Sequence, residues 1–134
     1  MANSIWKGYI AFGLVAFPVK LHAAARSQAQ VGIGLVFEKR AAQATGQDQT
    51  ALLQLALQNY LDVLYGKNLR DGEPAGSFWV KRAGLQAANV AETLGEWPQA
   101  VNVYRRMEEL LPPLRDLLEK KIANAQEHFA PGKN

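Results

Sequence analysis

Residues 77–112, SFWVKRAGLQAANVAETLGEWPQAVNVYRRMEELLP, decide the fold of this 134-residue chain. They contain two segments of helical periodicity, 77–94 and 98–111, with Gly95 as a stop signal between them. Pro98 lies in the first turn of the second segment, where a helix tolerates proline. Because the connection is so short, the two helices must be antiparallel neighbours. The stretch predicts a helical hairpin.

Six small, aromatic or helix-breaking residues recur in this hairpin at fixed spacing. If Lys81 is position 1 of a 34-residue unit, positions 8, 15, 17, 20, 24 and 32 are occupied by Ala88, Gly95, Trp97, Ala100, Tyr104 and Pro112. Small residues let two helices approach closely, glycine permits the tight turn, and the tyrosine fills the space between helices. This signature resembles the tetratricopeptide repeat.

The resemblance implies a protein-interaction module that is not an enzyme and that binds a peptide or helix on a concave surface. The first helix of the hairpin matches the groove-facing positions of the repeat with Arg82, Leu85, Asn89 and Glu92. Asn89 is the best single candidate, since an asparagine there can hydrogen-bond the backbone of a ligand. The alternative for Asn89 is an ordinary polar residue on the surface.

Three further helices are expected around this hairpin. The first covers residues 29–44 and is closed by Gly46. The second covers residues 49–65, with Asp48 as its N-cap, Gly66 as its stop, and one apolar face formed by Leu53, Leu57, Leu61 and Leu64. The last follows Pro112 and Pro113, reaches about residue 129, and carries the apolar residues Leu114, Leu117, Leu118, Ile122, Ala125 and Phe129. The prediction is five helices, the last a capping helix.

The earlier helices carry a degenerate copy of the repeat. Ala56 and Tyr60 repeat the small–aromatic step, and Gly34 is the matching small residue on the preceding helix, although about ten extra residues separate Gly34 from Ala56. Repeats of this type need about three units for stability, so two hairpins and a capping helix predict an unsatisfied apolar face. Self-association, a partner protein or a longer parent array would each satisfy it.

The N-terminal segment follows a different pattern. Apolar side chains alternate over residues 5–21, which is the period of a β-strand. The groups Ile5-Trp6-Lys7-Gly8, Phe12-Gly13-Leu14-Val15 and Pro18-Val19-Lys20-Leu21 resemble the start of bacterial Ku, a ring protein of DNA end joining. The resemblance ends near residue 28, so a fusion is the most economical interpretation.

The predicted organisation is therefore a Ku-like β segment over 1–28, a helical domain of tetratricopeptide type over 29–130, and a disordered tail over 131–134. The fold class is mainly α, built of antiparallel helical hairpins. The alternative function is DNA-end binding inherited through the N-terminal segment. In that case Lys7, Lys20 and Arg26 are the phosphate contacts, and they predict weak, salt-sensitive affinity.

Charge and composition narrow the function further. The whole net charge of +3 belongs to residues 1–28, while residues 29–134 contain 12 basic and 12 acidic residues, so the helical part gives no electrostatic case for nucleic acid. The chain has no cysteine and only two histidines, His22 and His128, without partners at metal-binding spacing. We expect no cofactor, no metal and no catalytic residue.

Localisation depends on the apolar stretch GYIAFGLVAF, residues 8–17, which is followed by Ala23, Ala24 and Ala25. This outline has some features of a signal peptide, but Lys7 is the only early cation and Pro18 and Lys20 interrupt the approach to a cleavage site. Cytoplasmic localisation is the preferred prediction. No apolar run is long enough to cross a bilayer, so no membrane partner is expected.

Overall fold

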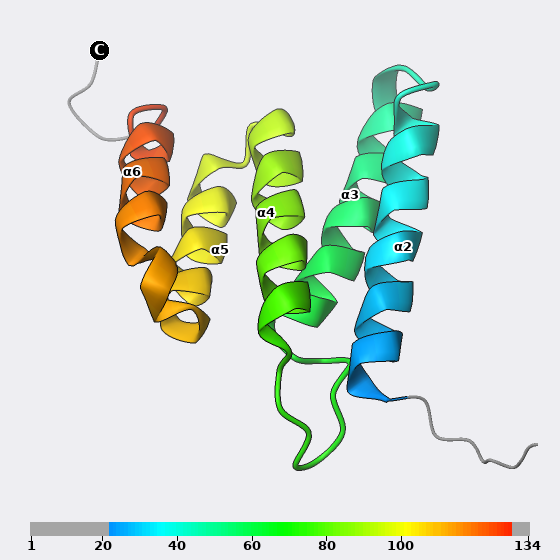
Figure 1. Cartoon of the computed structure of the whole chain (residues 1–134). Helices are drawn as coiled ribbons and strands as arrows, with labels where there is room; N and C mark the ends of the chain where they lie inside the picture. Colours follow the sequence, from blue (N-terminus) through cyan, green and yellow to red (C-terminus); the bar gives the residue numbers. More distant parts are fainter. Residues whose placement is uncertain (1–21, 130–134) are drawn as a thin grey trace, which may run out of the picture.

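The computed structural model describes residues 22–129. These residues form five α-helices and one short 3-10 helix: α2 Ala23–Ala41, α3 Gly46–Leu64, α4 Ser77–Thr93, α5 Trp97–Leu110, η2 Pro112–Leu114 and α6 Arg115–Gln126. Figure 1 shows the α-helices side by side in sequence order, each running antiparallel to the one before it. The mainly helical fold with five helices is confirmed. The predicted strand pattern over 5–21 and the tail over 131–134 lie outside the described residues.

Helix α2 begins earlier than the sequence predicted. It starts at Ala23 after the extended His22, so the last residues of the predicted β segment are helical. The expected start at Ala29 was six residues too late. The physical reason is the run of Ala23, Ala24 and Ala25, because alanine has the highest helix propensity of any residue type and the run extends the helix back into the Ku-like segment.

The predicted N-cap of the second helix is wrong. Asp48 is not the N-cap of α3, because this helix begins at Gly46 with Thr45 as its N-cap. Asp48 lies within the first turn, where its carboxylate interacts favourably with the helix dipole. Ser77 is the first residue of α4, and its N-cap is Gly76. The stops at Gly66 and Gly95 are confirmed, since both have the positive φ that only glycine adopts without strain, 75° and 76°.

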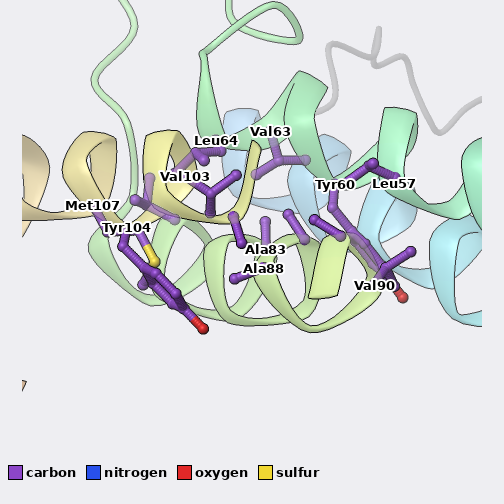
Figure 2. Close-up of a cluster of buried hydrophobic side chains, with 14 of the residues drawn as sticks. Leu57, Tyr60, Val63, Leu64, Ala83, Ala88, Val90, Val103, Tyr104 and Met107 are labelled. Atoms are coloured by element: carbon purple, nitrogen blue, oxygen red, sulfur yellow. The ribbon is translucent and has the colours of Figure 1, made fainter. Parts of the chain in front are cut away.

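Helix α4 is the centre of the core. It packs against α3 on one side and α5 on the other, and five of its seven buried residues are alanine or glycine: Ala83, Gly84, Ala87, Ala88 and Ala91. Figure 2 shows Ala83 and Ala88 in the middle of the cluster, with Tyr60 and Tyr104 near its two ends. These small side chains allow two neighbouring helices to approach α4 closely, which is what the repeat spacing predicted.

The C-terminal helix buries only part of its predicted apolar stripe. Leu118, Ile122 and Ala125 are buried, whereas Leu117 is 48% exposed and Phe129 43% exposed. Helix α6 ends at Gln126, before the predicted end at Phe129. Because α6 contacts α5 and η2 but has no helix on its other side within residues 22–129, Leu117 and Phe129 have no further helix to pack against.

The connection between α3 and α4 is held to the start of α2. The side chain of Arg26 forms an ion pair with Glu73 and donates a hydrogen bond to the carbonyl oxygen of Asn68. The amide of Asn68 in turn donates to the hydroxyl of Ser27, which is buried, at 2.8 Å. This loop, drawn at the lower end of α4 in Figure 1, is thus tied to the first helix by two consecutive side chains near the start of α2.

Candidate binding surface

The four residues predicted to bind a partner lie on α4 but do not form one site. Arg82 and Asn89 are exposed, and Leu85 and Glu92 are half-buried. Arg82 and Leu85 line one cavity near the start of the helix, Asn89 lines a second near its end, and Glu92 lines a third beside α6. The side chains therefore differ in what they can contact.

The cavity that holds Arg82 and Leu85 also contains Phe78 and Lys81 and has a volume of about 160 Å³. Phe78 and Lys81 also line a neighbouring cavity of about 460 Å³. Its other walls are Ser77 and residues 110–114, which lie at the end of α5 and in η2. Phe78 is 63% exposed. We call these two neighbouring cavities, which share Phe78 and Lys81 in their walls, the Phe78 groove.

The Phe78 groove was not predicted from the sequence, although one signal for it was present. Phe78 and Trp79 are adjacent at the start of a helix, so they point to different faces and only one of them can enter the core. Trp79 packs against the core, and its ring meets the ring of Phe78 edge to face, with centroids 4.8 Å apart. Phe78 is left on the outer face.

Asn89 lies in a cavity of about 200 Å³ between α4 and the first hairpin. The polar side chains of Glu38, Gln49 and Thr93 share this cavity with it. Its own side chain is exposed, and its backbone carbonyl accepts a hydrogen bond from the Thr93 hydroxyl at 2.9 Å. Ligand binding by the exposed Asn89 amide stays a prediction.

Glu92 is engaged inside the fold. Its carboxylate accepts a hydrogen bond of 2.8 Å from the hydroxyl of Tyr104 on α5. Burial of the Tyr104 phenol, followed by the hydrogen bond to Glu92, raises the pKa of Tyr104 well above its usual range. Glu92 therefore joins the two helices of the hairpin, and the sequence had offered it only as a groove residue.

The first hairpin contains a matching pair. The hydroxyl of Tyr60 on α3 donates to Glu38 on α2 at 2.5 Å, and Glu38 also accepts from the Gln86 amide on α4 at 3.0 Å. Burial and the contact with Glu38 raise the pKa of Tyr60 above its usual range. The signal in the sequence is a small residue followed four positions later by glutamate, Gly34 to Glu38 and Ala88 to Glu92.

These two pairs align Tyr60 with Tyr104 and Glu38 with Glu92. Gly34 lies against the ring of Tyr60 so closely that an added Cβ would approach it to 2.4 Å. Gly34 and Ala56 are 22 positions apart and Ala88 and Ala100 only 12. Most of the extra residues lie at the start of α3. This helix begins ten positions before Ala56, whereas α5 begins only three positions before Ala100. The first hairpin is longer in helix rather than in loop.

The other signature residues occupy the places that their chemistry requires. Ala88 and Ala100 are fully buried and Tyr104 is 4% exposed. Trp97 is half-buried, and its indole stacks on the His128 ring with centroids 3.6 Å apart and an angle of 8° between the planes. Pro112 begins the 3-10 helix that follows α5.

Of the three residues proposed for DNA contact, Lys7 and Lys20 lie outside the described residues. Arg26 is half-buried and pairs with Glu73 and the Asn68 carbonyl. The backbone N–H of Arg70 and the Arg26 guanidinium both hold the pKa of Glu73 below its usual range. A phosphate at Arg26 would therefore have to compete with a carboxylate that is already in place.

Within residues 22–129, no three His, Asp or Glu side chains cluster in a way that could hold a metal ion. No helix of this part of the chain is both long and apolar enough to span a bilayer.

The non-homologous end joining protein Ku of Solibacter usitatus (strain Ellin6076) is 64% identical to this chain over 28 residues, which are 21% of the chain and 10% of that Ku protein. The predicted resemblance to Ku is confirmed over this length. The chain thus corresponds to about one tenth of the curated relative. No protein-family model matches the chain, and no solved structure matches it.

Proposed function

We propose that residues 22–129 form a non-enzymatic protein-interaction module of the tetratricopeptide type, which binds a peptide or helix of a partner protein along the exposed side of α4. The proposal includes a cytoplasmic setting, where such a module meets its partners. The observation that carries it is the Phe78 groove, because it combines a strongly exposed aromatic ring with open apolar walls. Large apolar residues left on a surface around a cavity are characteristic of binding sites.

The repeat assignment is supported by the packing of the two hairpins. Each pairs a helix carrying a buried small residue with a helix carrying a buried tyrosine, and each tyrosine donates to a glutamate four positions after that small residue. An array of this kind places the first helices of successive hairpins next to one another, and α2 does contact α4. A ligand lying across these helices would meet Leu85 and Asn89.

Selection of a random peptide library against the full chain tests this function. We expect enriched peptides whose binding is strongly weakened by Leu85→Glu, which places a charge on the half-buried part of the surface. The matched control is Asn102→Ala, an exposed position on α5. If no peptide is enriched, or if Leu85→Glu and Asn102→Ala have the same effect, the proposed binding surface on α4 is wrong.

The match to Ku supports a second candidate, DNA-end binding. A gel shift with linear duplex DNA at low and moderate salt separates the two functions. The interaction module predicts no shift even at low salt. A salt-sensitive shift that Lys7→Glu and Lys20→Glu abolish would favour the DNA-binding function instead.

A further inference from the structure

We infer that the Phe78 groove recognises a peptide in which a large apolar side chain is flanked by carboxylates. The inference rests on the proposed function and adds the chemistry of the partner to it. It concerns the start of α4 and the end of α5, whereas the four residues predicted from the sequence extend along α4 to its far end.

The apolar part of the ligand follows from the walls of the groove. The larger cavity is bounded by the Phe78 ring, three leucines and two prolines, and its volume of about 460 Å³ falls in the range of about 300–1,000 Å³ that is typical of ligand sites. Proline at residues 112 and 113 restricts the backbone there, so this wall loses little freedom when a ligand binds. A leucine, phenylalanine or tryptophan side chain suits such a site.

The acidic part follows from the charges. Lys81 borders both cavities of the groove and Arg82 borders the smaller one, and no aspartate or glutamate lines either cavity. Neither cation forms an ion pair with another residue of 22–129. By contrast, the cavity beside Asn89 contains Glu38, and the cavity beside α6 contains Glu92 together with Lys121. The groove is the cationic site among these surfaces.

The same charges argue against the chain's own N-terminal segment as the occupant. Residues 1–21 are apolar enough to fill a groove, but they contain Lys7 and Lys20 and no acidic residue. Their charge has the same sign as that of Lys81 and Arg82, and like charges brought together oppose binding. A separate polypeptide with carboxylates beside its apolar anchor is complementary on both counts.

The library selection against the full chain tests this inference through the composition of the enriched peptides. We expect leucine, phenylalanine or tryptophan with neighbouring aspartate or glutamate, and weaker binding at higher salt. For a synthetic copy of the most enriched peptide, Phe78→Ser should raise Kd about tenfold or more, as loss of an aromatic anchor does. Lys81→Glu should raise Kd at least about fivefold. The control is Lys120→Glu, a charge reversal at an exposed position of α6. It should change Kd less than about twofold.

Two results would overturn the inference. One is enrichment of neutral or basic peptides, and the other is equal binding by wild type, Lys81→Glu and Lys120→Glu. If such peptides still lose binding in Leu85→Glu, the proposed function stands and only the acidic partner is wrong. If binding is also insensitive to Leu85→Glu, the proposed function fails with it. Sedimentation of the full chain shows whether a second copy fills the groove, because Phe78→Ser would then dissociate a dimer and the separate partner would be excluded.

Discussion

Gly32 and Gly34 lie two positions apart on the same helix, but only Gly34 packs closely against another helix. A Cβ at Gly34 would meet three atoms of the Tyr60 ring within 2.9 Å, whereas a Cβ at Gly32 would meet nothing within 4 Å. We expect Gly34→Ala to lower the free energy of unfolding by about 1–2 kcal/mol, because the ring must move in a close-packed core. Gly32→Ala should raise it by up to about 1 kcal/mol through helix propensity.

Urea denaturation of the two variants measures both effects, and the pair controls for the change from glycine to alanine itself. Equal stability of Gly32→Ala and Gly34→Ala would show that the Tyr60 ring adjusts at no cost. In that case Gly34 would not be the small residue that the repeat requires.

Glu108 is a buried acid next to another acid. The carboxyl group of Glu119 and, next, burial raise the pKa of Glu108. Because this pKa is higher in the folded than in the unfolded chain, the contribution of Glu108 to stability is present below the unfolded pKa and is lost as the pH rises through the folded pKa. We expect Glu108→Gln to melt at a higher temperature than wild type at neutral pH, with the difference disappearing near pH 4.

Thermal melting across this pH range checks the Glu108 prediction. The matched control is Glu109→Gln on the same helix, since Glu109 is exposed and pairs with Arg106 at 2.9 Å. Removing that surface ion pair should cost at most about 0.5 kcal/mol at neutral pH. A Glu108→Gln variant less stable than wild type at neutral pH would contradict the assignment of a raised pKa.

At the scale of the element, each hairpin contains a hydrogen bond from a tyrosine on its second helix to a glutamate on its first. Tyr60→Phe and Tyr104→Phe remove the hydroxyl and leave the ring in place, so each should lower the free energy of unfolding by about 1–2 kcal/mol. The two tyrosines have different partners, so the double variant should show additive losses within about 0.5 kcal/mol. Tyr65→Phe, at a ring that is 41% exposed, is the control and should be nearly neutral.

Chemical denaturation of the single and double variants measures these losses. A large coupling between Tyr60 and Tyr104 would show that the hairpins do not contribute separate pairs. It would also weaken the argument that they are two copies of one repeat.

The loop between α3 and α4 depends on Glu73. Its pKa is lowered by the Arg70 backbone N–H and by Arg26, so its contribution to stability is present above the unfolded pKa and is lost as the pH falls through the folded pKa. We expect Glu73→Gln to increase amide hydrogen exchange in residues 66–76 at neutral pH, with no added effect in acid. Asp71→Asn, a neutralised exposed acid in the same loop, is the control and should leave exchange unchanged. Equal exchange in both variants would mean that the contact with Arg26 does not hold the loop.

At the scale of the whole molecule, the boundary between the Ku-like segment and the helical domain can be tested by truncation. The sequence predicts that deleting residues 1–28 leaves a cooperative helical protein with a modest loss of stability. The structure sharpens this expectation, because residues 23–28 are the first turns of α2 and include Arg26 and the buried Ser27. Deletion of 1–28 should therefore destabilise the protein much more than deletion of 1–21.

Thermal melting and sizing of the two truncated proteins check this. Nearly equal melting temperatures would show that the tie from α2 to the loop contributes little. Complete unfolding after deletion of 1–21 would show that the N-terminal segment belongs to the same core, and the fusion interpretation would lose its basis.

Much of the helical framework could be predicted from local chemistry. Glycines at 66 and 95 end helices because of the backbone angles they adopt, Pro98 opens one, and the alanines of α4 fall on its buried faces. The first helix was placed less well because Ala23, Ala24 and Ala25 follow a strand-like pattern and were grouped with it. Helix ends are decided by a few tenths of a kcal/mol per residue, which neighbouring contacts easily override.

The sequence by itself therefore determined that residues beyond the Ku-like segment form helical hairpins, because periodicity, small residues and stop signals act within a few positions of each other. Only the tertiary structure decided which polar side chains remain open to a partner. Glu92 accepts a hydrogen bond from Tyr104, and Arg26 pairs with Glu73. Phe78 and Lys81 remain exposed at a groove whose other wall is formed by residues 110–114. Such pairings join residues distant in sequence, and no local pattern specifies them.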